Sequence, residues 1–383
     1  MTGNPQPPPL YIIDLSKPPK ERYADICKDF TVEIKELSQV YDEILQMTGY
    51  PRILGCIAKL LLRRVFSKDE TKEIRGISEA SGIPLNLVVA YNTFLDLFSG
   101  CVSGGVQVQE RGMLHFRGLD WHMEPLREMI IRVQYVRGGK VVARAVTYAG
   151  YVGTLTGVRE GLSIALNYRA RINSSHTVRS HRWHQLSLLL GWRPSISSQL
   201  RTFLLSPGPA PTLAQVAEVL AQSTSSPCYL TFCSPTSVML VEKDLRTAVV
   251  HESDNFLSVT NHDKAMEGWT QEDWHRIITE EGIPDVGGVH DIMKDSIERK
   301  ECMSNLWKTT IGADGTAAGP SASSPVTVGD VKQWLRTYPI RNETTHFSCI
   351  MDPSAPGGGL VWVETCEGAL AACTNSNMTT TLI

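Results

Sequence analysis

The chain has 383 residues, of which 42% are hydrophobic and 20% are charged, and it carries a net charge of −3. These values are typical of a globular protein with one large domain or two ordinary ones. A chain without a basic excess is not expected to be a general nucleic-acid-binding protein. No stretch approaches the ~18 consecutive apolar residues of a transmembrane helix. The 9 cysteines are dispersed and form no C-x-x-C or C-x-x-H pair, so neither a zinc site nor a dense disulfide framework is expected.

The N-terminal sequence MTGNPQPPPLYIIDLSKPPKERY lacks a charged region followed by an apolar stretch. A secretory signal peptide has both features in that order. We therefore expect a cytoplasmic protein in a reducing compartment.

The first hundred residues have mainly helical hydrophobic spacing. Pro51 opens one of the predicted helices and Gly82 ends another, and the last helix runs into Ser99-Gly100. The predicted elements are a strand over 10–15, one long helix or two shorter ones over 18–48, and helices over 51–66, 68–81 and 84–98.

From Cys101 onward the hydrophobic period becomes alternating, which is typical of strands. Residues 101–109 and 113–120 are predicted to form a hairpin with a turn at Glu110-Arg111-Gly112. The other predicted strands are 128–137, 140–149, 162–167, 228–234, 237–242, 247–250, 345–351 and 359–364. The predicted helices are 182–205, 212–223, 288–305 and 327–337, and 312–325 is predicted to be a low-complexity loop. This succession predicts an α+β fold, or layered sheets with flanking helices.

The predicted hairpin brings side chains that could take part in catalysis close to one another. If Gln109 pairs with Met113, Cys101 falls opposite about Trp121 and beside Asp120. Arg117 lies a few residues back along the same strand. Local pairing alone therefore predicts a thiol, a guanidinium and a carboxylate in one pocket.

A lone cysteine needs a base, because a free thiol with a pKa of ~8.5 is mostly protonated at neutral pH. The candidate histidines have no spacing that marks a Cys–His pair; they are His115, His122, His176 and His181. If the Gly100–Cys101 bond were cleaved, Cys101 would own an α-amino group with a pKa of ~7.7–8.0 that could act as the base. The alternative is a buried cysteine near an Arg–Asp surface pair.

The segment GIPLNLVVAYNTFLDLFSGC, followed by VS and FRGLD, resembles the autocleavage region of acid ceramidase and N-acylethanolamine acid amidase. In that family an Arg and an Asp follow the nucleophilic Cys by 16 and 19 residues, and Arg117 and Asp120 match both offsets from Cys101. The resemblance extends over most of the chain. It includes PPLYIIDLSKPPKERYADI, AGYVGTLTGVREGLSIALNYR and the TNHD sequence at 260–263.

The resemblance implies an N-terminal-nucleophile hydrolase with an αββα sandwich. It also implies that a precursor, or zymogen, cuts itself between Gly100 and Cys101. Residues 1–100 would then form a helical α-subunit, and residues 101–383 a catalytic β-subunit with the αββα core, associated as an α/β heterodimer.

The same resemblance assigns roles to individual residues. Cys101 would be the nucleophile and, through its freed amine, the base, while Asp120 would bind that amine. Arg117 would position the substrate or the amine network. Asn261, in the TNHD sequence, would stabilise the tetrahedral oxyanion.

Three features depart from the family. Tyr168 stands where the family has a Glu that assists self-cleavage, and Gly118 stands in place of an Asn. The lysosomal relatives are secretory, whereas this sequence begins without a signal, which favours an intracellular protein that works at neutral pH. A further basic residue of the site is assigned to Arg299, with Arg276 as an alternative.

The function implied by the resemblance is that of a cysteine amidase, which hydrolyses the amide bond of an N-acyl lipid through an acyl-thioester on Cys101. Asn167, Tyr168 and Trp121 are the predicted substrate-binding residues. The alternatives are an N-acyltransferase with an amine acceptor and a non-maturing lipid-binding protein. No metal or cofactor is expected. Residues 179–205 mix Arg, Trp and Leu, which predicts either a lid in contact with lipid or an ordinary packed helix.

Overall fold

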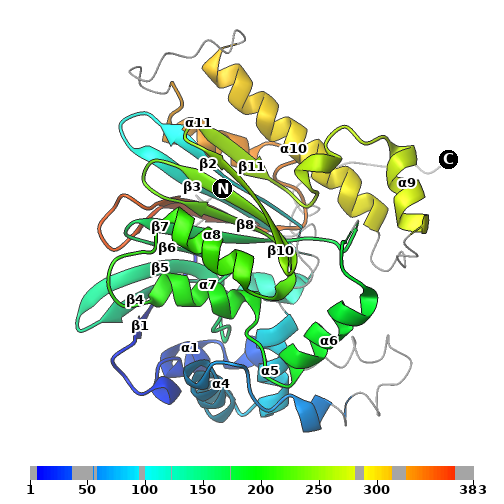
Figure 1. The fold of residues 1–383 in the computed structure, drawn as a ribbon. Coiled ribbons are helices and arrows are strands. Elements are labelled where there is room, and N and C mark those ends of the chain that lie inside the picture. The colour runs from blue at the N-terminus through cyan, green and yellow to red at the C-terminus, as the bar shows by residue number, and fades with distance from the viewer. Residues whose placement is uncertain are drawn as a thin grey trace, which may run out of the picture.

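The computed structural model describes residues 7–36, 55, 58–94, 100–121, 123–172, 174–280, 289–312 and 325–366. Figure 1 shows two β-sheets packed face to face with helices on their outer sides. The strands are β1 (Leu10–Asp14), β2 (Gly100–Val108), β3 (Gly112–Asp120), β4 (Ile130–Arg137), β5 (Lys140–Tyr148), β6 (Thr156–Arg159), β7 (Leu162–Tyr168), β8 (Ser225–Cys233), β9 (Val238–Leu245), β10 (Thr247–Ser253), β11 (Phe256–Val259), β12 (Thr345–Asp352) and β13 (Gly359–Thr365). The α-helices are α1 (Ala24–Asp29), α4 (Lys68–Ser81), α5 (Leu85–Phe94), α6 (Val178–Leu189), α7 (Ile196–Leu205), α8 (Leu213–Gln222), α9 (Gln271–Glu280), α10 (Val289–Ile311) and α11 (Val328–Arg336). Short 3-10 helices are η1 (Pro19–Glu21), η3 (Glu124–Met129) and η4 (Lys264–Met266).

The larger sheet has the strand order β1-β4-β5-β6-β7-β8-β9-β10, and the smaller has the order β11-β2-β3-β12-β13. Helices α10 and α11 contact the smaller sheet, whereas α7 and α8 contact the larger one. Strands β2 and β3 contact β7 and β8 across the interface between the sheets. The expected αββα sandwich is therefore confirmed.

The first hundred residues share the core of the sandwich. Strand β1 pairs in parallel with β4, so the chain before Cys101 supplies an edge strand of the larger sheet. The buried Glu73 carboxylate of α4 accepts hydrogen bonds from Arg22 and from Arg201 of α7, each at 2.9 Å for one pair of atoms. The Asn92 side chain of α5 accepts from the backbone N–H of Val152 at 2.7 Å. Polar contacts and the shared sheet thus bind the two predicted subunits together.

Most predicted elements are found close to their expected bounds. The helix predicted over 68–81 is confirmed as α4, because Ser67 caps it by accepting from the Glu70 N–H and Gly82 ends it at φ 72°. The stretch 182–205 instead forms two helices, α6 and α7. Gly191, at φ 64°, follows the first helix, and Ser195 caps the second. Strands β6 and β11 and helix α9 were not predicted.

Other predictions fall partly or wholly outside the described residues. These are parts of the helices predicted over 18–48, 51–66 and 84–98, and most of the loop over 312–325. Among the helices that the structure describes, none is long and apolar enough to cross a membrane.

The predicted hairpin exists, but its register was wrong. Val108 pairs with Gly112, so the turn falls one residue earlier than expected, with Glu110 at φ 63° and Gly112 at φ 82°. Cys101 consequently lies opposite Leu119 rather than Trp121. A shift by two positions keeps every side chain on its predicted face of the sheet.

Candidate active site

Cys101 is the second residue of β2 and is fully buried in the hydrophobic cluster that contains Trp121 and Tyr148. Its backbone N–H donates a hydrogen bond of 2.9 Å to the side-chain oxygen of Asn261. Gly100, its neighbour, pairs with Asp120 across the hairpin. The predicted cleavage bond therefore lies between two residues that face polar side chains from other segments of the chain.

Asn261, just beyond the end of β11, links four parts of the fold. Its backbone N–H donates to Ser296 Oγ of α10 at 2.7 Å, and its Nδ2 donates to the Tyr168 carbonyl oxygen at 2.8 Å. Its Oδ1 accepts from Arg299 Nη2 at 3.2 Å as well as from the Cys101 N–H. Because the partners of Oδ1 are donors and the partner of Nδ2 is an acceptor, the network fixes which way the amide faces.

Asp120 and Arg299 form a buried ion pair beside Gly100. Arg299 Nη1 donates to Asp120 Oδ2, and the Thr345 hydroxyl donates to Asp120 Oδ1 at 2.7 Å. The two residues are only 2% and 3% exposed. A Cβ built on Gly100 would lie 3.4 Å from the Asp120 Cβ. Burial at this level requires that each charge be compensated, and here the pair supplies that compensation.

Arg117 belongs to a neighbouring network rather than to this ion pair. Its guanidinium donates to Asn167 Oδ1 and, at 2.6 Å, to the carbonyl of Leu166. Ser103, opposite Arg117 on β2, also donates to Asn167 Oδ1, at 2.9 Å. Asn167 Nδ2 donates in turn to the carbonyl of Thr260 at 3.0 Å, next to Asn261. The buried Arg117 thus supports the segment that carries Asn261.

Tyr168 and Trp121 lie near these networks in different ways. Burial raises the pKa of the Tyr168 phenol, so this group stays protonated at neutral pH. The Trp121 indole packs edge-to-face on Tyr148, with ring centroids 5.8 Å apart. The Tyr148 hydroxyl lies 2.9 Å from His346 Nδ1, and burial raises the pKa of Tyr148 well above its usual value. Trp121 and its two aromatic neighbours therefore form one packed unit.

Several other candidates have contacts away from this cluster. Arg276, the alternative to Arg299, lies on α9, where it pairs with Asp273 at 3.0 Å and is largely exposed. The His115 ring is buried against Ser163, and His176 and His181 face Asp244. His122 lies outside the described residues. Among the described residues, no group of three or more His, Cys, Asp or Glu side chains is arranged to hold a metal ion.

Sequence reasoning missed two residues that hold the cluster together. Ser296 lies one helical turn before Arg299, so helical spacing could have placed both on one face of α10. Thr345 contacts Asp120 from 225 residues away in sequence, and no local signal marks it.

Comparison with known proteins supplies the relatives of this fold and site. A family model described as the beta subunit of N-acylethanolamine-hydrolyzing acid amidase matches residues 6–66. Acid ceramidase of Heterocephalus glaber is 28% identical over 189 residues, which covers 44% of this chain and 48% of that protein. N-acylethanolamine-hydrolyzing acid amidase of Caenorhabditis elegans is 30% identical over 173 residues, 42% of this chain and 48% of the relative. A solved structure of a Caenorhabditis elegans N-acylethanolamine-hydrolyzing acid amidase ortholog is 22% identical, with a TM-score of 0.47, over 67% of this chain and 94% of that one.

The αββα sandwich, with a buried cysteine at the start of an inner strand, is the arrangement that the resemblance in the sequence led us to expect. The resemblance to the acid ceramidase and N-acylethanolamine acid amidase family is confirmed by these relatives. The chain spans about half the length of the relatives it matches in sequence.

Proposed function

We propose that the chain is a self-cleaving cysteine amidase that acts on the amide bond of an N-acyl lipid of the ceramide or N-acylethanolamine type. The observation that carries this proposal is the 2.9 Å hydrogen bond from the Cys101 N–H to Asn261, beside the buried Asp120–Arg299 pair. Such a cluster holds both the thiol-bearing residue and the peptide bond before it in a fixed orientation. The names of the relatives supply the substrate class.

The proposed maturation step breaks the Gly100–Cys101 bond. The Cys101 sulfur attacks the Gly100 carbonyl carbon, and the thiol proton passes to the departing Cys101 nitrogen. Water then hydrolyses the thioester, which leaves a carboxylate on Gly100 and a free α-amine and thiol on Cys101. Asn261 and Asp120 are the proposed partners of the new amine: Asn261 Oδ1 accepts from the Cys101 N–H, and Asp120 pairs with Gly100 across the hairpin. The products are the predicted fragments 1–100 and 101–383.

The proposed catalytic step uses the same sulfur on a substrate amide. The α-amine of Cys101 takes the thiol proton and passes it to the leaving amine, while the acyl group forms a thioester with Cys101. Water releases the fatty acid. Asn261 is the proposed oxyanion donor through its Nδ2, whose direction is set by the contact with the Tyr168 carbonyl. Arg117 acts indirectly, because its hydrogen bonds go to Asn167 and Leu166.

The fragments are expected to stay together after the cut. Strand β1 remains paired with β4, and Glu73 remains paired with Arg201 across the two fragments. Breaking a buried ion pair of this kind strongly destabilises the folded protein. A stable α/β heterodimer is the proposed mature form.

Lipid contact is part of the proposal and is supported by exposed aromatic side chains near α6. Trp183 and Trp192 are 54% and 53% exposed, with ring centroids 6.3 Å apart. The backbone of Arg64 lies against Gly191, which brings the exposed Phe66 and its segment to the same region. Tryptophans favour membrane interfaces. In a flotation experiment, the fraction of the protein that floats with lipid vesicles should fall when both tryptophans are replaced by serine.

The decisive experiment is intact-mass analysis of the purified protein. Fragments ending at Gly100 and starting at Cys101 are expected, and Cys101→Ala should leave the chain whole. The matched control is Cys302→Ala, which removes a partly exposed thiol on α10 and should not affect cleavage. An uncut chain at every pH, with no labelling of Cys101 by thiol-directed or fluoroacyl probes, would favour a lipid-binding protein without activity.

Product analysis then separates hydrolase from acyltransferase. The matured protein is incubated with an N-acylethanolamine or a ceramide, with and without an added amine. Free fatty acid as the sole acyl product supports the hydrolase. A new amide that forms in proportion to the added amine supports the transferase.

Tyr168 tests the maturation step separately. Burial raises the pKa of its phenol, so the group stays protonated at neutral pH and supplies no base, and Tyr168→Phe should cut at an unchanged rate. Tyr168→Glu restores the carboxylate of the related family and should cut faster. A loss of cleavage in Tyr168→Phe would assign the phenol an active role.

The cytoplasmic location expected from the sequence stays a proposal. Subcellular fractionation of the full-length protein would test it.

A further inference from the structure

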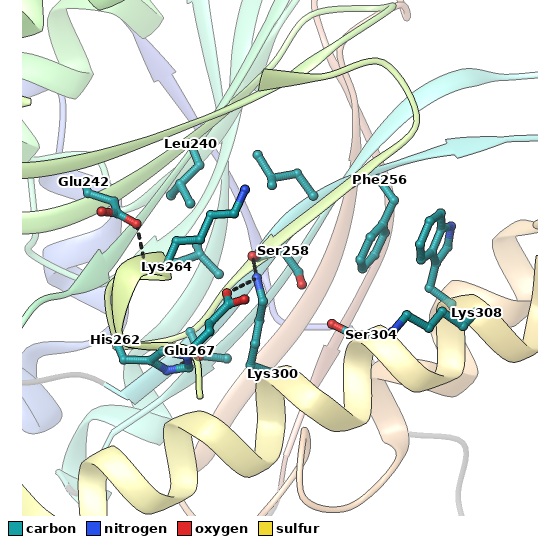
Figure 2. Close-up of a pocket in the computed structure, with 14 residues that line it drawn as sticks. Leu240, Glu242, Phe256, Ser258, His262, Lys264, Glu267, Lys300, Ser304 and Lys308 are labelled. Carbon is teal, nitrogen blue, oxygen red and sulfur yellow. Dashed lines mark hydrogen bonds and ion pairs between the residues drawn. The ribbon is translucent and has the colours of Figure 1, made fainter. Parts of the chain in front are cut away.

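A cavity of about 190 Å³ lies along β11, the edge strand of the smaller sheet, and is walled by β9, η4 and α10. We call it the β11 cavity. Figure 2 shows lysine side chains from two of these elements around it, Lys264 from η4 and Lys300 and Lys308 from α10. The Cys101 thiol is not among its lining residues, so the β11 cavity is separate from the candidate active site.

The lysines of the β11 cavity are only partly compensated. Glu267 lies 3.6 Å from the Lys300 ammonium, which also donates to the carbonyl oxygen of Ser258. No described carboxylate forms an ion pair with the ammonium of Lys264 or of Lys308. Lys264 and Lys308 are both exposed to solvent, and the three lysines and two glutamates that line the cavity sum to a net charge of +1.

Glu242 supplies the second carboxylate of the β11 cavity. Glu242 accepts the backbone N–H of Lys264 at 2.8 Å, and it lies 3.4 Å from His251 Nε2. The nearby His262 ring is held neutral, because burial and the charges of Lys300 and Arg299 lower its pKa to about 4. With His262 neutral, the three lysines and two glutamates leave the lining with a net charge of +1 at neutral pH.

One wall of the β11 cavity is apolar and rigid. Phe256 and Trp307 stack with centroids 4.6 Å apart and an interplanar angle of 7°. Leu240 and Leu257 continue the apolar lining. Figure 2 shows Lys308 on the same side of the cavity as Phe256 and Lys264 toward the other end, so the organic part of an anion could pack on the wall next to Lys308.

We propose that the β11 cavity binds a phosphate group, either as inorganic phosphate or as a compact phosphomonoester. A phosphate carries about −1.5 to −2 at pH 7, and the lysines that line the cavity are the groups available to bind it. Lysine ammoniums serve as point-charge donors to phosphate oxygens.

The β11 cavity is joined to the candidate active site by covalent neighbours. Lys300 follows Arg299, whose guanidinium binds Asp120 and Asn261. His262 and Thr260 flank Asn261. A phosphate that draws Lys300 away from the Ser258 carbonyl therefore acts on the segments that orient the Cys101 N–H.

Phosphate binding is measurable without any catalytic activity, so its failure and the failure of the amidase proposal are distinguishable. The full-length protein and its Cys101→Ala variant are titrated with inorganic phosphate by calorimetry and by tryptophan fluorescence. The Lys264→Ala/Lys308→Ala double variant should bind roughly tenfold or more weakly, because two charge-assisted hydrogen bonds are lost. Lys72→Ala removes an exposed lysine of α4 and should bind like the wild type.

A second variant locates the bound phosphate. Trp307→Phe keeps the stacked wall but removes the reporter next to the cavity, so the affinity should persist while the fluorescence change falls. Two results would overturn the proposal: no binding at millimolar phosphate, or binding that the double lysine variant leaves unchanged.

The source of the phosphate is distinguished by three ligands. Glycerol 3-phosphate that competes with inorganic phosphate supports a soluble phosphomonoester. Binding to phosphatidic acid vesicles that is lost in the double lysine variant supports a lipid headgroup. Vesicle binding that persists in that variant, with no soluble phosphate bound, would overturn the proposal in favour of a general surface contact.

Discussion

The site around Cys101 and the β11 cavity are built from neighbouring residues of the same two segments. The buried charges of the site are paired with each other, whereas two lysines of the cavity have no carboxylate partner among the described residues. Arg299 is 3% exposed and bonded to Asp120 and Asn261, whereas Lys308, two to three turns along the same helix, has no ion-pair partner among the described residues. Asn261 faces Cys101, and its neighbour His262 lines the cavity. A closed network fixes geometry, because any change of partner leaves a buried charge uncompensated. Lysines without carboxylate partners remain available to bind an anionic ligand.

The strongest test of the closed network removes its carboxylate. Asp120→Ala leaves the Arg299 guanidinium buried without its counter-ion, and we expect a loss of about 3–5 kcal/mol in the free energy of unfolding. Guanidinium chloride unfolding measures this loss. The matched control is Asp69→Ala, which breaks an exposed pair with Lys72 and should cost at most about 0.5 kcal/mol. A loss below about 1 kcal/mol for Asp120→Ala would mean that the pair is not a buried, compensated unit.

The second test uses pH at the boundary between the two regions. His262 is 4% exposed, and its pKa falls to about 4 from 6.5, first because of burial. In the unfolded chain the His262 ring therefore becomes protonated below pH 6.5, whereas in the folded chain it becomes protonated only near pH 4. Stability should be complete above pH 6.5 and decline by up to about 3 kcal/mol as the pH falls to 4.

His262→Asn keeps a donor toward Ser296 but has no ionisable ring. The free energy of unfolding of this variant should therefore fall less between pH 6.5 and pH 4 than that of the wild type, by up to about 3 kcal/mol. Denaturant unfolding at stepped pH values compares the two proteins. His184→Gln serves as the control at a second buried histidine, because burial also lowers the pKa of His184 to about 4. An unchanged slope in His262→Asn, with a reduced slope in His184→Gln, would contradict the assignment.

Local signals in the sequence predicted the elements better than the contacts between them. Gly82 marked the end of α4 correctly. The four-residue strand β11 was missed because so short a segment shows almost no periodicity. The hairpin turn was misplaced by one residue, because the alternation of apolar residues fixes the face of a strand but not its register.

The candidate site shows the same division. The resemblance to the related family named Asp120 and Asn261, with Arg299 or Arg276 as the further basic residue, and the structure brings Arg299 together with the first two. The position of Arg117 could not be derived from the hairpin alone, since its partners Asn167 and Leu166 lie in the other sheet. Contacts between sheets depend on packing that no local spacing encodes.

A third test weakens the support of Asn261 without touching a charge. Ser296 is fully buried; its hydroxyl accepts from the Asn261 N–H at 2.7 Å and lies 2.7 Å from His262 Nδ1. Ser296→Ala should lower the free energy of unfolding by about 1–3 kcal/mol, because it leaves buried polar groups unpaired. Ser296→Thr keeps the hydroxyl and should recover part of this loss. Equal stability of Ser296→Ala and wild type would contradict the bridging role.

The smallest effect is expected on the open side and completes the contrast. Lys308 is exposed, and its ammonium has no carboxylate partner among the described residues, so Lys308→Ala should change the free energy of unfolding by no more than about 0.5 kcal/mol. Thermal unfolding in buffer without phosphate measures this baseline. Added phosphate should raise the melting temperature of the wild type more than that of the variant, since a ligand stabilises the state that binds it. A loss above about 1 kcal/mol without phosphate would show that Lys308 supports the fold, as Arg299 does.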